Sequence, residues 1–156
     1  MITEKILKEK KIDYMKKDIL IFWLTFLFIS FTCTNYGKTN KVSIDIEKSD
    51  KFSIKEIHRA LDCVKNKFED FKGCNLTKLW YDEDRSNKSI ELYLKNGKGL
   101  VNGSKAENVI VLFSNFDVGS SGVNQGFNPN STYSDWNWIL IRDNTMGNWR
   151  VDDWGY

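Results

Sequence analysis

The sequence is poor in histidine, proline and cysteine: its 156 residues contain one, one and three of them. With His58 as the only imidazole, a histidine-rich metal site is excluded, and a serine or cysteine nucleophile has a single candidate partner. The chain also lacks a basic excess. From Thr34 onward, thirteen Lys and four Arg are balanced by seventeen acidic residues. Nucleic-acid-binding proteins usually carry a basic surface, so no nucleic-acid partner is expected.

Phosphate and calcium motifs are missing as well. The Gly-Ser run "GSSG" at 119–122 is not followed by the lysine of a P-loop. An EF-hand loop counted from Asp82 would need Gly and Glu where the sequence has Asn87 and Tyr93. We therefore expect neither a cofactor nor a bound metal.

What is present begins with the segment "MKKDILIFWLTFLFISFTC" at 15–33, in which two lysines precede an apolar run from Ile19 to Phe31. This arrangement is typical of an export signal, and an uncleaved membrane anchor is the alternative. Cys33 stands where a bacterial lipoprotein carries its lipid, although the bulky Phe31 departs from that pattern. Either way, the remainder is expected on the extracytoplasmic side of the cell membrane or secreted. For residues 1–14 the hypothesis is a mis-annotated extension, with translation starting at Met15.

A polar linker is expected at 34–50, followed by a single α+β domain over 51–156. The clearest helix is "FSIKEIHRALDCVKNKFEDFKGC". Ser53 and Glu56 have the spacing of a capping box, and Phe52 and Ile57 that of a hydrophobic staple. Apolar residues then recur at helical spacing, and Gly73 is placed to end the helix.

Strands are predicted after this helix. "CNLTKLWY" at 74–81 and "AENVIVLFSNF" at 106–116 have strand composition, whereas "SNKSIELYLKNG" fits a strand or a helix face equally well. A loop is expected at 117–134. The closing "WNWILIR" and "WRVDDWGY" are separated by turn residues and predict a C-terminal β-hairpin that buries its tryptophans against the helix.

Two cysteines lie in or beside the helix. Cys63 borders the apolar stripe, and Cys74 follows the helix end. In an oxidising compartment they are candidates for a disulfide, which would stabilise the fold by about 3 kcal/mol. Two reduced, buried thiols are the alternative.

The order of elements resembles the nuclear transport factor 2-like superfamily, in which a curved antiparallel sheet wraps an N-terminal helix to form a cone. The segments "CVKNKFEDFKGCNLTKLWYDEDRSNK", "ENVIVLFSNF" and above all "WRVDDWGY" also resemble uncharacterised extracytoplasmic domains of Gram-positive bacteria, which follow lipoprotein-type signals. The resemblance implies an aromatic-lined cavity that either holds a ligand or is filled by side chains. Enzymes of the superfamily, such as ketosteroid isomerases, use Asp and Tyr inside the cone.

The sequence therefore favours an exported or membrane-tethered, non-enzymatic domain that binds an unknown ligand or partner at the cell envelope. Trp80, Trp138 and Trp154 are the candidate pocket residues, because aromatic rings offer a large contact area. One alternative is a small cone-type enzyme acting on a hydrophobic compound, with Asp152 or Asp153 as base. Since neighbouring strand residues point to opposite faces, only one of this pair is expected to face inward. A structural homodimer built on the sheet face is the other alternative.

Overall fold

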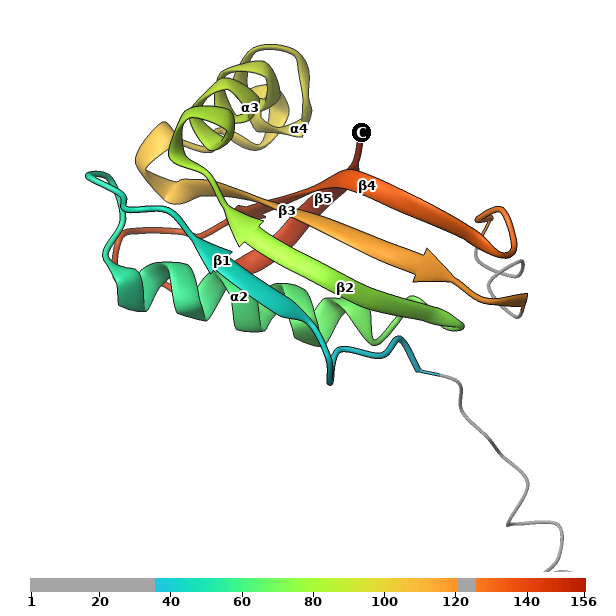
Figure 1. The fold of residues 1–156 in the computed structure, drawn as a ribbon. Coiled ribbons are helices and arrows are strands. Elements are labelled where there is room, and N and C mark those ends of the chain that lie inside the picture. Colours follow the sequence, from blue (N-terminus) through green and yellow to red (C-terminus); the bar gives the residue numbers. More distant parts are fainter. Residues whose placement is uncertain (1–35, 121–125) are drawn as a thin grey trace, which may run out of the picture. The chain divides into compact units, whose positions relative to one another are not determined.

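A computed structural model describes residues 36–120 and 126–156. These residues form an α+β fold in which five strands make one open sheet, ordered β1-β2-β3-β4-β5 as in the chain (Figure 1). The predictions for residues 1–14 and 15–33 fall outside the described residues. The elements are β1 (Ser43–Ile46), α2 (Ile54–Phe68), β2 (Cys74–Tyr81), α3 (Glu83–Asn96), α4 (Lys98–Asn102), the 3-10 turn η1 (Ala106–Asn108), β3 (Val109–Val118), β4 (Ser131–Ile141) and β5 (Arg150–Gly155).

Helix α2 begins where its sequence predicts. The Ser53 hydroxyl accepts a hydrogen bond from the main-chain N–H of Glu56, and the Glu56 carboxylate accepts one from the main-chain N–H of Ser53 at 2.8 Å. This capping box satisfies N–H groups that have no partner inside the helix. The apolar stripe is buried along its length, at Ile57, Ala60, Leu61, Val64 and Phe68.

The predicted end of this helix is wrong. The helix stops at Phe68, and Gly73 lies in the turn that leads into β2, with a left-handed φ of 78°. That turn is closed by a hydrogen bond from the Cys74 N–H to the Phe71 carbonyl at 3.1 Å. Gly73 therefore supplies the conformation predicted for it, but to the entry of a strand rather than to a helix cap.

The sheet is mixed, whereas an antiparallel one was expected. Strand β1 runs parallel to β2, with Ser43 opposite Lys78, and the other three pairings are antiparallel. Strand β1 also lies inside the 34–50 segment that the sequence analysis assigned to a linker. Three of its four residues are exposed, so it has no buried alternation that a sequence pattern could reveal. It is a strand because its backbone pairs with β2.

The chain before β1 is also part of the domain. The N–H of Gly37 donates to the Glu69 carbonyl at 3.0 Å, and the N–H of Lys38 donates to the Cys74 carbonyl at 2.9 Å. A Cβ atom on Gly37 would lie 2.0 Å from the Phe68 carbonyl oxygen, so only glycine fits there. The described part of the expected linker is therefore held against the end of α2 and the start of β2.

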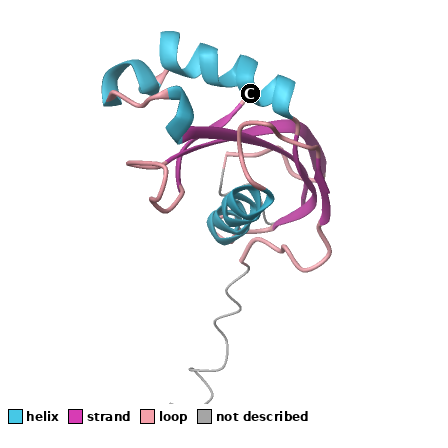
Figure 2. Cartoon of the chain, turned by 90° about the vertical axis from the view of Figure 1, so that its left-hand side faces the viewer, coloured by secondary structure: helices cyan, strands magenta, loops and turns pink. Residues whose placement is uncertain are grey.

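The two faces of the sheet are covered by different helices (Figure 2). Helix α2 packs in the concave side of the curved sheet, where its stripe meets residues such as Leu76, Ile110 and Trp138. Helix α3 covers part of the other face through Ile90 and Tyr93. Strand β3 lies between the two layers, and its residues 109–113 alternate between them. Burial on both faces explains why "VIVLF" is continuously apolar.

The ambiguous segment at 86–97 is helical, as part of α3. Asp82 is the N-cap and accepts from the Arg85 N–H at 2.9 Å, and acidic residues follow in the first turn. Both features stabilise a helix N-terminus. The helical spacing of Ile90 and Tyr93 then places both side chains against the sheet, while Leu92 is 63% exposed.

The C-terminal hairpin forms as β4 and β5, and it buries only part of its aromatic content. Trp138 is fully buried and Trp149, just before β5, is 8% exposed. Trp136 is half-buried, and Trp154 is 42% exposed. The expectation that the hairpin buries its tryptophans therefore holds for the first two and is wrong for Trp154.

Candidate functional site

Of the three tryptophans predicted to line a pocket, two lie together. Trp138 and Trp154 are opposite each other in the β4–β5 pairing, with ring centroids 6.4 Å apart. Trp138 belongs to the core: it is fully buried, and its indole N–H donates to the buried Ser114 hydroxyl at 2.8 Å. Trp154 lies above it, partly open to solvent. Trp138 therefore forms the buried base of this candidate site, and Trp154 forms part of its surface.

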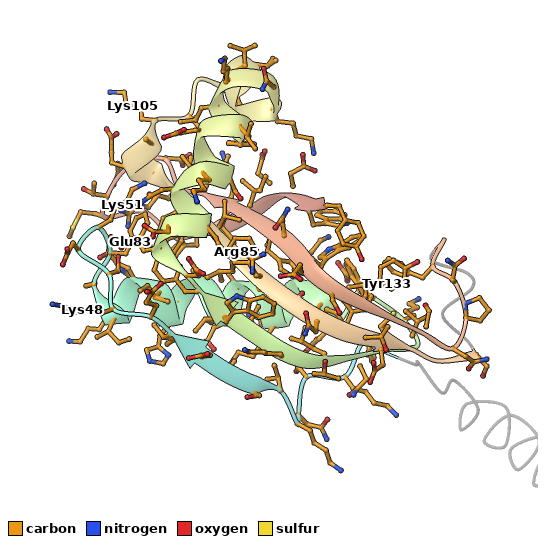
Figure 3. All side chains as sticks on the ribbon, turned by 45° about the horizontal axis from the view of Figure 1, so that its top comes forward. Lys48, Lys51, Glu83, Arg85, Lys105 and Tyr133 are labelled. Atoms are coloured by element: carbon orange, nitrogen blue, oxygen red, sulfur yellow. The ribbon has the colours of Figure 1, made fainter. Side chains whose placement is uncertain are left out.

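Trp80 is not part of this arrangement. It packs with the cluster on the α3 side of the sheet, where its ring centroid is 5.9 Å from that of Phe113. Arg85 of α3 is labelled in Figure 3, and its guanidinium lies 4.2 Å from the Phe113 centroid and 5.8 Å from the Trp80 centroid. Lys78 lies 5.0 Å from the Trp80 centroid. The prediction of one pocket built from three tryptophans is therefore wrong, since a sheet separates Trp80 from the other two.

The concave side carries a group of aromatic residues beyond the C-terminal end of α2. We call the aromatic surface the set Phe127, Tyr133, Trp136, Trp154 and Tyr156. Tyr156 is 78% exposed and its ring meets that of Trp136 edge-on, at 5.2 Å. Trp136 in turn contacts the rings of Tyr133 and Phe127, each at 5.8 Å. The surface runs from open rings at Trp154 and Tyr156 down to the buried core.

The base of the aromatic surface is a cluster of closely packed rings. Phe71 and Phe116 are buried beneath it, and Phe116 stacks on Tyr133 with centroids 5.1 Å apart and planes almost parallel. Phe71 contacts Phe127 at 5.5 Å and Trp154 at 6.3 Å. Ring pairs in these offset or edge-on arrangements each contribute about 0.5–1.5 kcal/mol. Buried rings therefore support Trp154, Phe127 and Tyr133 from below, whereas, among the described rings, Tyr156 contacts only the half-buried Tyr133 and Trp136.

Two polar features accompany the rings. The Lys67 ammonium of α2 lies 4.9 Å from the Trp154 centroid and 2.9 Å from the Asp70 carboxylate. The indole N–H of Trp136 is buried, and it has no hydrogen-bond partner among the described residues. Indole N–H groups usually find an acceptor when buried. The surface thus combines a large apolar area with a cation, and an unpaired donor is buried beneath it.

Sequence reasoning missed Trp136 and Tyr156, and a signal for them was present. Side chains two apart on a strand share a face, so Trp136 belongs with Trp138, and Tyr156 with Trp154. Lys67 had no comparable signal, because its position over a ring of β5 depends on how α2 packs on the sheet.

The two aspartates considered as a catalytic base lie on the α3 side of the sheet. Asp152 accepts a hydrogen bond from the Tyr93 hydroxyl at 2.7 Å, and Asp153 is 3.1 Å from the Lys98 ammonium. The prediction that only one of the pair faces inward is wrong. Strand β5 has a bulge at this point, which inserts one residue between the partners of Ile139 and Leu140.

The same contacts affect the titration of Tyr93. Burial raises the pKa of its hydroxyl, and the hydrogen bond to the Asp152 carboxylate raises it further. The Asn102 side-chain amide also donates to this hydroxyl, at 2.8 Å. Tyr93 therefore stays protonated and joins α3, α4 and β5. Neither aspartate lines the concave side, where a cone-type enzyme would hold its base.

Both described cysteines, Cys63 and Cys74, are free thiols. The structure therefore has the two reduced thiols and not the disulfide. The Cys63 thiol donates to the Trp149 carbonyl at 3.4 Å, near β5, and the Cys74 thiol to the Lys72 carbonyl at 3.9 Å. Burial raises the pKa of both thiols, that of Cys74 to about 11. Neither is a nucleophile at neutral pH, because the thiolate is the reactive form. Cys33, the candidate lipid attachment residue, lies outside the described residues.

Residues 36–120 and 126–156 contain no group of three His, Cys, Asp or Glu side chains that could hold an ion. Within the same ranges, no helix is both long enough and apolar enough to cross a membrane.

The chain belongs to a family described as a domain of unknown function, DUF4829, whose model matches residues 29–155. The match takes in every described strand and helix, and it includes β1, which supports placing that strand inside the domain. No curated protein and no solved structure gives a significant match.

Proposed function

We propose that this DUF4829 domain is an exported or membrane-tethered, non-enzymatic binding domain that holds a ligand or partner of the cell envelope on its aromatic surface. The observation that carries this proposal is the exposure of Trp154, which lies on the buried rings of Phe71 and Trp138, and of Tyr156, which packs on the half-buried Tyr133 and Trp136. Large rings that are open to solvent and fixed from below are typical of binding surfaces.

The N-terminal sequence supports the proposed location. The segment at 15–33 has the plan of an export signal or anchor, and Cys33 stands at the position of a lipidated cysteine. The resemblance to extracytoplasmic domains of Gram-positive bacteria leads to the same compartment. A domain placed there meets lipids, cell-wall polymers and secreted molecules.

The proposal also includes a nuclear transport factor 2-like origin of the fold. A sheet curved around α2, with aromatic side chains beyond the helix end, supports this relationship (Figure 2). In such a fold the space between helix and sheet either holds a ligand or is filled by side chains. Here Phe71 and Trp138 fill its inner part, so we propose that the ligand lies on the outer rings.

The ligand class follows from the surface chemistry. Five rings present apolar faces, and Lys67 lies beside one of them. A flat apolar or partly apolar group with a nearby acceptor would stack on Trp154 and meet the ammonium. We therefore expect an amphiphilic ligand rather than a highly charged one.

Binding is tested with 1-anilinonaphthalene-8-sulfonate, an amphiphilic anionic fluorophore, and with lipid extracted from bacterial envelopes. We expect the probe to bind the native protein, the extract to displace it, and Trp154→Ala or Tyr156→Ala to reduce binding at least fivefold. The matched control is Leu92→Ala, which removes an exposed apolar side chain on α3. Equal binding by all variants would contradict the proposed surface.

The homodimer alternative is tested in parallel by sedimentation of the full chain over a range of concentrations. A dimer that Trp154→Ala dissociates would make the aromatic surface a self-association site instead. The compartment is tested by intact mass of the native protein from membrane and medium fractions. A chain that begins at Cys33 with added acyl mass would establish lipidation, and one that retains Met15 would establish an anchor.

A further inference from the structure

A cavity lies away from the aromatic surface, between the α4–β3 connection and the β4–β5 turn. Its volume is about 440 Å³, within the range of small-molecule sites. The connection contributes residues from Asn102 to Asn108, and the turn contributes Asp143 to Thr145. Lys105, on its rim, and Tyr133, in the aromatic surface, lie far apart in Figure 3.

The cavity is lined by charges of both signs. Lys105, Arg142 and Arg150 are its cations, and Glu107 and Asp143 are its acids. The one ion pair within this set joins Arg150 and Asp143 loosely, at 3.5 Å between exposed side chains. Pairs of this kind are weak and can exchange partners. A ligand with only a negative charge would therefore leave the acidic side chains without a counter-charge. A ligand with only a positive charge would leave the basic side chains without one.

The wall contains two buried polar atoms without a hydrogen-bond partner among the described residues. One is a donor, Nε of Arg142, and the other is an acceptor, Oδ1 of Asn108. The other two nitrogens of the guanidinium each make a hydrogen bond: Nη1 donates to Glu56 at 2.7 Å and Nη2 to the Glu107 carbonyl at 3.1 Å. An unpaired buried polar group destabilises a fold by about 1–3 kcal/mol, so two such groups in the wall of one cavity require a physical explanation.

From these observations we propose that the cavity binds a small zwitterion, an α-amino acid with its carboxylate on the Arg142 side and its ammonium on the Asn108 side. The carboxylate accepts from Nε and neutralises Lys105 or Arg150. The ammonium donates to Oδ1 and neutralises Glu107 or Asp143. Both unpartnered atoms are shielded from solvent, and Asn108 is half-buried. The proposal therefore includes a rearrangement of the Asn108 side chain that lets the ligand reach them.

Arg142 is a suitable fixed point for such a ligand. Its side chain is 3% exposed and its guanidinium lies 4.3 Å from the Trp149 ring centroid. A guanidinium held by an ion pair and a ring loses little freedom when it binds a carboxylate. Specificity for a zwitterion then comes from the mixed charges around it.

The test measures binding of L-alanine to the full-length protein by calorimetry or NMR titration, beside propionate and ethylamine. These two analogues keep the carboxylate or the ammonium and remove the other charge. We expect alanine to bind at least tenfold more tightly than either. Propionate that binds as tightly as alanine would overturn the zwitterion, and absence of binding by all three would overturn the site itself.

Variants complete the test. Asn108→Leu removes the acceptor at similar volume and is expected to weaken alanine binding at least tenfold, with the melting temperature checked to confirm that the fold persists. Lys105→Ala should weaken alanine binding severalfold. Lys95 is an exposed cation on α3, and Lys95→Ala should leave alanine binding unchanged. Unaltered binding in Asn108→Leu would contradict the proposed site. Trp154→Ala should not affect alanine, which keeps this proposal separate from that of the aromatic surface.

Discussion

Glu56 and Arg142 form an ion pair across 86 residues of sequence, with Nη1 donating to Oε1 at 2.7 Å. Their side chains are 20% and 3% exposed. The neighbouring Trp149 contacts both, since its ring lies under the guanidinium and its indole N–H donates to the Glu56 carbonyl at 3.1 Å. The start of α2 is thereby joined to the end of β4 and the start of β5.

Breaking this pair should destabilise the domain strongly. Glu56→Gln keeps a side chain that can complete the capping box, but it leaves a buried guanidinium without a counter-charge. We expect a loss of about 3 kcal/mol in the free energy of unfolding, measured with urea. The control is Asp62→Asn, which breaks an exposed pair with Lys65 and should cost less than about 1 kcal/mol. Similar losses in the two variants would contradict the structural role of the buried pair.

The stability of the domain should fall at acidic pH because of Glu56. The Ser53 hydroxyl, and then Arg142, lower the pKa of the Glu56 carboxyl to about 2 from an ordinary value of 4.5. The folded state therefore holds the charged form more strongly than the unfolded state does. This contribution is complete above pH 4.5 and is lost as the pH falls towards about 2. Urea unfolding at several pH values should show the difference between the native protein and Glu56→Gln shrinking over that window. A constant difference would be the contrary result.

The two tryptophans of the β4–β5 pair should differ in their effect on stability. Trp138→Ala empties a fully buried site and should cost about 3–5 kcal/mol, whereas Trp154→Ala, at a residue 42% exposed, should cost about 1 kcal/mol. If Trp138→Ala does not fold, Trp138→Phe serves instead, because it removes only the hydrogen bond to Ser114 and part of the ring. Equal costs at the two positions would mean that Trp154 is a core residue rather than a surface one.

The thiols should be free and slow to react. With Cys33→Ser as background, we expect iodoacetamide to leave Cys63 and Cys74 unmodified in the native protein at neutral pH, because burial raises the pKa of both. Both should be alkylated after unfolding without reductant, as mass spectrometry would show. Resistance to alkylation in the unfolded, unreduced protein would establish the disulfide instead.

The helix α2 and the strand β2 could be predicted from the sequence because their signals are local. A capping box joins Ser53 to a residue three positions away, and the apolar stripe needs only the period of the helix. Gly73 shows the limit of this reasoning. Its preference for a left-handed conformation is local, but whether that conformation ends a helix or begins a strand is not.

Segments with weak local signals depended on their neighbours. The residues at 86–97 fit two periods, and packing of Ile90 and Tyr93 against β3 favours the helix. Strand β1 has no buried face that would give a recognisable sequence pattern, and only its pairing with β2 makes it a strand. The ion pair of Glu56 with Arg142 had no signal at all, since nothing in the sequence relates two residues so far apart.

The sequence by itself determined that the domain is α+β, that it is neutral, and that it ends in an aromatic hairpin. Only the tertiary structure decided which aromatic residues meet. A strand reverses the faces of its side chains whenever it shifts by one residue, and each of the three antiparallel pairings contains such an irregularity. Register therefore placed Trp80 on one side of the sheet and Trp138 with Trp154 on the other. The bulge in β5 moved Asp152 and Asp153 together to the α3 side, because one inserted residue cancels the alternation that the sequence implies.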